Sequence, residues 1–153
     1  MTTAAGSAGL RTDVVSSVRA ALQAYVWAWQ GPTEAVADWE SATDAKDLDI
    51  WCHDSDVAGV RAAIEKALSA ARIEQADDPR RLRHTGWAVF TDSGLAVVDI
   101  TFGDLRVGPL LLCPQDAVTS ADHRLTGVAA AADLLVRPLL RGRIPVASRI
   151  EEA

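Results

Sequence analysis

The segment Asp47-Leu48-Asp49-Ile50-Trp51-Cys52 alternates acidic and large apolar residues, and this alternation constrains the fold more than any other feature of the chain. Side chains two residues apart on a β-strand share a face. A strand over 47–52 would direct Asp47 and Asp49 to one face and Leu48 and Ile50 into a core. Two adjacent carboxylates on a half-buried surface are costly unless a cation neutralises them. The segment therefore predicts either a divalent-metal site or a solvated strand end.

A third acid favours the metal interpretation. Asp99 lies within the nearly unbroken apolar run Leu95–Phe102, although aspartate is depleted in strands. Carboxylates on two neighbouring strands can share one or two Mg²⁺ ions, whose coordination is completed by water and substrate phosphates. We therefore expect Asp47, Asp49 and Asp99 to bind Mg²⁺ (or Mn²⁺).

The bulk properties indicate an ordinary globular chain. Its 153 residues fit one domain, expected over 11–153, and the small, polar residues 1–10 are expected to form a disordered lead-in. No apolar run approaches the roughly 20 residues that span a bilayer. A net charge of −6 argues against binding long nucleic acids. Cys52 and Cys113 lie in apolar surroundings, which favours reduced core thiols and a cytoplasmic location.

The periodicity predicts an α+β domain with a small mixed or antiparallel sheet flanked by helices. One helix is expected to begin at Thr12 or Asp13, and another at Asp54–Asp56. Trp27–Trp29 fits either the end of the first helix or a short strand. Residues 114–153 are expected to form a mainly helical tail. Strands are expected at 47–52, 86–91, 95–102 and 105–113.

At this point the chain resembles the nucleotidyltransferase superfamily, the polymerase-beta-like fold. The family mark is an acid-hydrophobic-acid-hydrophobic strand followed later by a third strand acid, and Asp47, Asp49 and Asp99 match it. The resemblance is closest to nucleotidyltransferase-like domains found beside kinase-like domains in bacterial biosynthetic proteins. Some of these carry a tail similar to 139–145. The resemblance covers roughly residues 14–150 and implies a nucleotidyltransferase-like fold.

The chain departs from the family pattern before the acidic strand. The family usually has a Gly-Ser or Gly-Gly pair there, whose backbone amides hold the nucleotide phosphates. The nearest candidate is Gly31-Pro32-Thr33, further upstream than usual. Pro32 removes one amide donor. This departure favours a fold that binds a metal but positions a nucleotide poorly.

Four further residues are candidates for nucleotide or phosphate binding. Lys46 directly precedes the acidic strand, although an ordinary ion pair would explain it equally well. Trp51 shares a face with Asp49 in a regular strand and could stack on a base or sugar. Arg81 and Arg83 belong to the only dense basic cluster, which is also typical of a solvated turn. His84, at the end of that cluster, is expected to be structural or on the surface.

The resemblance implies a Mg²⁺-dependent transferase that moves a nucleoside monophosphate from a nucleoside triphosphate to an unidentified acceptor hydroxyl. In that reaction Asp47 and Asp49 would bind the metal, and Asp99 would share a second ion and assist deprotonation of the acceptor. A second hypothesis is a catalytically degenerate binding or regulatory module. A third is a partner subunit of a kinase or of a toxin–antitoxin pair, or a homodimer, with the helical tail as the interface.

Overall fold

The computed structural model describes residues 9–44, 46–69, 71–73 and 83–144, and these form a mixed α+β fold. Within them, seven strands form one mixed sheet in the order β3-β4-β5-β2-β1-β9-β8. Its strands are β1 Trp27–Trp29, β2 Asp47–Cys52, β3 Ala71–Ile73, β4 His84–Thr91, β5 Gly94–Phe102, β8 Thr119–Ala121 and β9 Arg124–Thr126. Strands β6 Leu105–Val107 and β7 Leu110–Cys113 form a separate hairpin. The helical segments are α1 Arg11–Leu22, α2 Ala35–Ser41, α3 Val57–Leu68, α4 Gly127–Ala131, a π-helical turn Ala132–Val136 and α5 Arg137–Leu140, with short 3₁₀ turns at Asp54–Asp56 and Gln115–Ala117.

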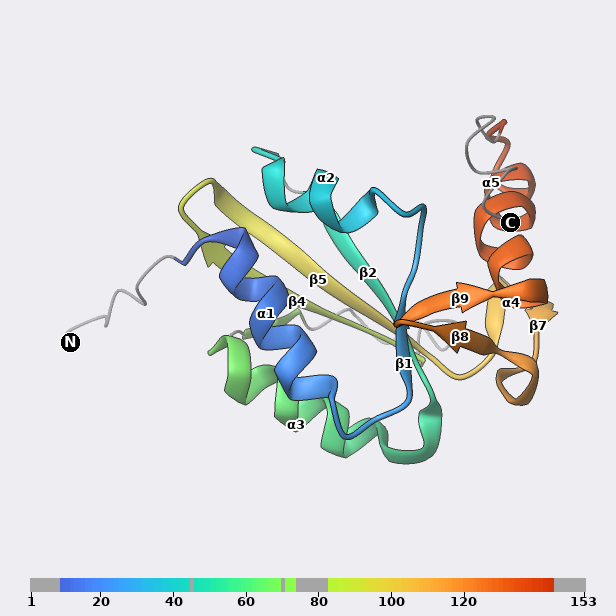
Figure 1. Ribbon diagram of the computed structural model, residues 1–153, viewed down its shortest axis with the longest axis horizontal. Coiled ribbons are helices and arrows are strands. Elements are labelled where there is room, and N and C mark those ends of the chain that lie inside the picture. Colours follow the sequence, from blue (N-terminus) through green and yellow to red (C-terminus); the bar gives the residue numbers. More distant parts are fainter. Residues whose placement is uncertain (1–8, 45, 70, 74–82, 145–153) are drawn as a thin grey trace.

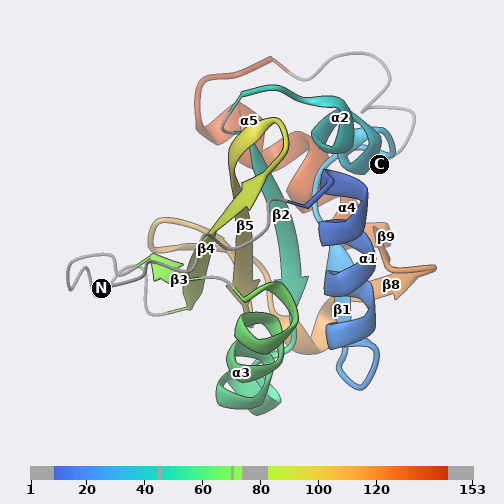
Figure 2. The same cartoon turned by 90° about the vertical axis from the view of Figure 1, so that its left-hand side faces the viewer.

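Helices α1 and α3 lie side by side against one face of the sheet, away from α4 and α5 (Figures 1 and 2). The apolar side of α1 is buried there, with Val18 and Leu22 fully inaccessible. It packs in one core with Ile50 of β2 and Ile100 of β5. The opposite face of the same two strands carries the acids.

Strands β2 and β5 form the centre of the sheet and run parallel to each other. β1 pairs antiparallel with β2, and β4 pairs antiparallel with β5 across a hairpin turn at 92–94. The strand predicted over 47–52 is confirmed in its bounds. Trp27–Trp29 is a strand, with the two indoles in a T-shaped contact at 4.9 Å between ring centroids.

Apart from the 3₁₀ turn at Gln115–Ala117, the segment 114–126 is not helical, so the prediction of a helical tail from residue 114 is wrong in its first part. A second hairpin, β8–β9, occupies the region, because Asp122 and His123 adopt positive φ angles that reverse the chain. β9 then extends the sheet by pairing with β1. The expected strand at 105–113 is instead the β6–β7 hairpin, which turns at Gly108. The sheet is therefore larger than expected, and the continuous helix begins at Gly127.

Other expectations from the sequence have mixed outcomes. Cys52 and Cys113 are buried and not disulfide-bonded, as predicted, and burial raises the pKa of the Cys52 thiol to about 12. No helix in the described part of the chain is both long enough and apolar enough to cross a membrane. Most of the lead-in expected at 1–10, and the end of the tail at 145–153, lie outside the described residues.

Candidate functional site

The parallel pairing of β2 and β5 brings the predicted acids onto one face. In this register Asp49 lies opposite Asp99, and Asp47 lies opposite Val97. The alternate residues Leu48, Ile50, Val98 and Ile100 are buried in the core on the other side. Asp47, Asp49 and Asp99 all line one cavity. The three acids therefore share one face of the sheet and one cavity, and their joint binding of a metal ion stays a prediction.

The electrostatics of these acids reflect their closeness. Burial, then the charge of Asp99, raises the pKa of Asp49 to about 6, against a lowering effect of Arg137. The same two causes raise the pKa of Asp47, and His84 opposes them. Asp49 keeps solvent-accessible surface because it lines an open cavity. Lost hydration and the neighbouring carboxylates both favour the protonated form of Asp49, which accounts for the direction of the shift.

Asp99 differs from the other two acids because a histidine side chain lies directly against it. Its Oδ1 lies 2.5 Å from Nε2 of His84 on β4. The histidine is held from its other side by Thr101, with Nδ1 3.3 Å from Oγ1. Although the ion-pair distance is short, this buried Oδ1 has no well-directed hydrogen bond among the described residues. Asp99 thus lines the cavity while its Oδ1 is buried against the His84 ring.

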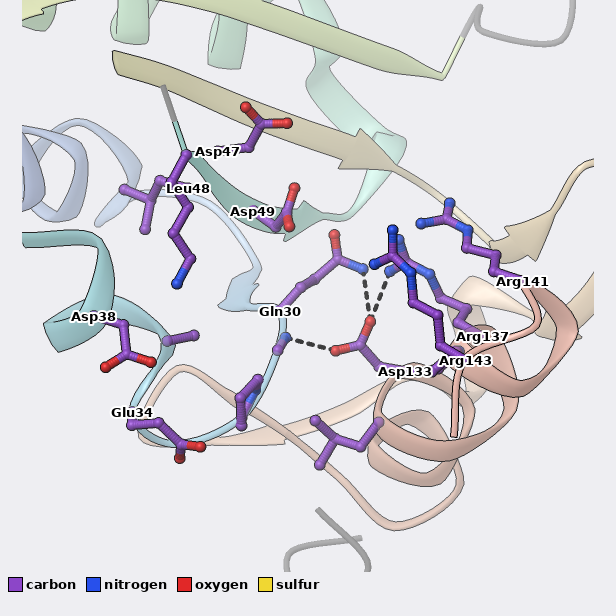
Figure 3. A pocket seen from close by; sticks show the side chains of 16 residues that line it. Gln30, Glu34, Asp38, Asp47, Leu48, Asp49, Asp133, Arg137, Arg141 and Arg143 are labelled. Carbon is purple, nitrogen blue, oxygen red and sulfur yellow. Dashed lines mark hydrogen bonds and ion pairs between the residues drawn. The ribbon is translucent and has the colours of Figure 1, made fainter. Parts of the chain in front are cut away.

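Two adjoining cavities, of about 380 and 830 Å³, open on the acidic face. Together we call them the cleft. The smaller lies toward Gln30, Gly31 and α2, and the larger toward His84, Asp99 and β6. The residues common to both are Asp47, Asp49, Arg137, Arg141 and Arg143. Figure 3 shows Asp47 and Asp49 on one side of the smaller cavity and the three arginines on another.

The three arginines, which we call the arginine wall, are brought together by two local features of the chain. Pro138 lacks an amide hydrogen and its ring clashes with the preceding turn, which accounts for the π-helical turn at Ala132–Val136 just before it. Gly142, at φ +72°, then ends the helix: its amide donates to Leu139 and the amide of Arg143 donates to Pro138. The reversal lets Arg143 follow Arg141 into the cleft. Arg137 and Arg141 are one helical turn apart and share a face.

The positive charges of the arginine wall are close enough to repel one another. Burial, then the charges of Arg137 and Arg143, lowers the pKa of the Arg141 guanidinium. Asp49 and Asp133 act in the opposite direction. Arginine stays protonated despite such a shift, so the wall is a fixed positive surface.

A buried carboxylate, Asp133, joins the helix to the loop after β1. Its Oδ1 accepts hydrogen bonds from Arg137 Nη1 at 2.6 Å and Gln30 Nε2 at 3.3 Å. Its Oδ2 accepts from the amide of Gly31 at 2.7 Å (Figure 3). The Gly31 amide is therefore occupied, and Pro32 has none. The segment considered as a phosphate-binding loop from the sequence has its first amide directed at a protein carboxylate.

The four weaker candidates have different locations. Lys46 lines the smaller cavity, and Arg83 lines the larger one with Nη1 3.3 Å from Oδ2 of Asp104. Trp51 is 1% exposed and its indole donates to the carbonyl of Gly103 at 2.6 Å. It shares the face of Asp49, as expected, but this burial does not fit the stacking role on a base. Arg81 lies outside the described residues.

Sequence reasoning missed His84 as a site residue, and also the arginine wall and Asp133. The i, i+4 spacing of Asp133, Arg137 and Arg141 was visible, but nothing placed that helix over the acidic strands. In the sequence, the segment 139–145 stands out only through the family resemblance. His123, in contrast, has a structural contact: it stacks on Trp27 with ring centroids 4.1 Å apart.

The acids form an open arrangement rather than a closed metal cage. Among the described residues, no group of three or more His, Cys, Asp or Glu side chains lies close enough together to hold a metal ion by itself. Mg²⁺ usually takes one or two protein carboxylates and keeps water or substrate phosphate oxygens as its other ligands. Comparison with known protein families and with curated protein sequences gave no match to this chain. Functional inference therefore depends on the cleft itself.

Proposed function

We propose that the protein is a Mg²⁺-dependent nucleotidyltransferase-like protein that uses a nucleoside triphosphate and an acceptor hydroxyl. The observation that carries the proposal is the register of β2 and β5, which sets Asp49 opposite Asp99 and Asp47 on the same face. Each acid stands in a strand whose other face is fully apolar. Such a placement costs stability and is typical of functional sites.

The donor set fits a hard divalent cation. Asp47 and Asp49 offer carboxylate oxygens with raised pKa values, and a cation would relieve both their mutual repulsion and their lost hydration. Asp99 lines the larger cavity beside them, with its Oδ1 against His84 Nε2. When bound, Mg²⁺ would neutralise phosphate charge and hold the reacting groups in line. Asp47 and Asp49 would hold the ion that carries the triphosphate, and Asp99 would share a second one.

The chain's own residues would then serve distinct steps. Asp99, oriented by His84, accepts the proton of the acceptor hydroxyl. The freed oxygen forms a bond to the α-phosphorus, the bond from that phosphorus to the bridging oxygen breaks, and pyrophosphate leaves. Lys46 and Arg83 border the two ends of the cleft and would contact the phosphates or the acceptor. In-line transfer of this kind depends mainly on positioning and charge neutralisation.

Calorimetry with Mg²⁺ and each nucleoside triphosphate tests the binding part. The wild type should bind the metal–nucleotide complex, and the Asp47→Asn/Asp49→Asn variant should bind it at least tenfold more weakly (about 1.4 kcal/mol). Pyrophosphate release across a panel of hydroxyl acceptors tests the reaction, and Asp99→Asn should abolish it. Equal, weak binding by wild type and double variant would exclude the site.

A second candidate function is a nucleotide-binding or regulatory module without turnover. The observation that favours it is the Gly31 amide, which is engaged by Asp133 where the family would hold a phosphate. This hypothesis expects metal–nucleotide binding that depends on Asp47 and Asp49, with no pyrophosphate released for any acceptor. A single turnover that depends on Asp99 would exclude it.

A further inference from the structure

The cleft has two walls of opposite charge with open space between them. Asp47 and Asp49 form one wall, and the arginine wall forms the other. Arg137 is held by Asp133, but Arg141 and Arg143 have no ion-pair partner among the described side chains. Two guanidinium groups therefore line a cavity, and neither pairs with a carboxylate of the described residues.

Structural explanations account for only part of this arrangement. A cation near the end of a helix is favourable for the helix dipole, which applies to Arg141. It does not explain why Arg143, beyond the Gly142 reversal, lines both cavities as well. Nor does it explain the mutual repulsion at Arg141, which costs free energy in the absence of an anion.

We propose that Arg141 and Arg143, supported by Arg137, form a polyphosphate clamp that takes the place of the Gly-rich phosphate loop in this chain. The inference rests on the proposed function and names the part of the substrate that the arginines hold. A metal-bound polyphosphate carries its cation and its anionic oxygens side by side, which matches a carboxylate wall facing an arginine wall. Guanidinium groups suit this role because their planar donors bind phosphate oxygens in pairs.

Asp133 links the loop after β1 to the arginines that take its place in phosphate binding. By accepting from the Gly31 amide and from Arg137, it closes the loop after β1 and also fixes the base of the arginine wall. The Asp133 carboxylate thus occupies the Gly31 amide and also positions Arg137. Phosphate recognition is thereby moved from backbone amides on one side of the cleft to side chains on the other.

Calorimetry with inorganic tripolyphosphate, first in metal-free buffer and then with Mg²⁺, tests the clamp. In both buffers Arg141→Gln/Arg143→Gln should bind tripolyphosphate at least tenfold more weakly than the wild type (about 1.4 kcal/mol). Arg19→Gln/Lys66→Gln is the matched control, because it removes two positive charges from α1 and α3 on the far face of the sheet. It should bind tripolyphosphate like the wild type.

The Asp47→Asn/Asp49→Asn variant separates this inference from the proposed function. In metal-free buffer it should bind tripolyphosphate more tightly than the wild type, because two negative charges are gone, and it should lose the gain that Mg²⁺ gives. If Mg²⁺ has no effect that depends on these acids while the arginine dependence persists, the metal site fails and the clamp stands. If the arginine variant binds like its control, or the wild type binds no tripolyphosphate in either buffer, the clamp is wrong.

Discussion

The two faces of the β2–β5 strand pair have opposite effects on stability, although their residues alternate along the same six paired positions. On the face under α1 and α3, Leu48, Ile50, Val98 and Ile100 are at most 2% exposed and contribute to stability. On the cleft face, Asp47, Asp49 and Asp99 crowd negative charge together. The comparison teaches that alternation in one strand pair can join a stabilising surface to a destabilising one. The cost on the second face is the physical sign of a site.

Two adjacent valines on β5 test this comparison, and the expected change in the free energy of unfolding is the largest of those predicted. Val98 is fully buried in the core, whereas Val97 is half-buried on the cleft face beside Asp47. Val98→Ala should lower the free energy of unfolding by about 2–3 kcal/mol, from lost burial and the cavity left behind. Val97→Ala should lower it by less than about 1 kcal/mol. Urea denaturation measures both, and equal losses would show that the two faces do not differ as described.

Asp133 should show that one carboxylate near the cleft is stabilising. Asp133→Asn leaves Arg137 without its charge partner while the Gly31 amide keeps an acceptor. We expect a loss of about 1–3 kcal/mol, less than for a fully buried pair because the Arg137 side chain is 18% exposed. Asp116→Asn, with a side chain 91% exposed, is the control and should change stability by less than about 0.5 kcal/mol. If the Asp133→Asn variant is as stable as this control, the Asp133 carboxylate does not stabilise the fold near the cleft.

Asp49, in contrast to Asp133, should destabilise the folded protein at neutral pH. Its folded-state pKa of about 6 lies above the ordinary 3.8, so the folded protein holds the proton more tightly than the unfolded chain. Stability from this group is present below pH 4 and is lost as pH rises through 6. Asp49→Asn should therefore raise the free energy of unfolding by about 1 kcal/mol at pH 7.5, after discounting for solvent screening. The gain should shrink to nearly zero at pH 4, and a gain that does not depend on pH would contradict the assignment.

Much of the acidic face could be predicted from residues alone. The alternation in 47–52 fixed which side chains share a face, and the apolar run around Asp99 placed the third acid in a strand. The hairpin turn at 92–94 also determines the β4–β5 register, in which Gly86 lies opposite Asp99 and His84 two residues further along the same face. His84 was therefore within reach of sequence reasoning, although its type favoured a surface residue.

The arginine wall could not be predicted in the same way. Its position over the acids depends on the β8–β9 hairpin, which returns the chain to β1 before the helix begins. That hairpin turns at Asp122 and His123, which have positive φ angles although neither is a glycine. The sequence therefore gives no usual sign of this turn. The burial of Trp51 was likewise decided by partners far along the chain, Leu105 and Cys113 among them. Contacts that connect distant segments set these features, and local patterns do not report them.

Mn²⁺ binding at pH 7.5, followed by electron paramagnetic resonance, tests the central claim most directly. The claim is that the cleft face of β2 and β5 holds a divalent cation through Asp47 and Asp49. The wild type should bind Mn²⁺, and Asp47→Asn/Asp49→Asn should bind it at least tenfold more weakly (about 1.4 kcal/mol). Asp54→Asn/Asp56→Asn, which changes the chain's other Asp-x-Asp segment, should bind Mn²⁺ like the wild type. Unchanged binding in the Asp47/Asp49 variant, or equal losses in the two variants, would contradict the account.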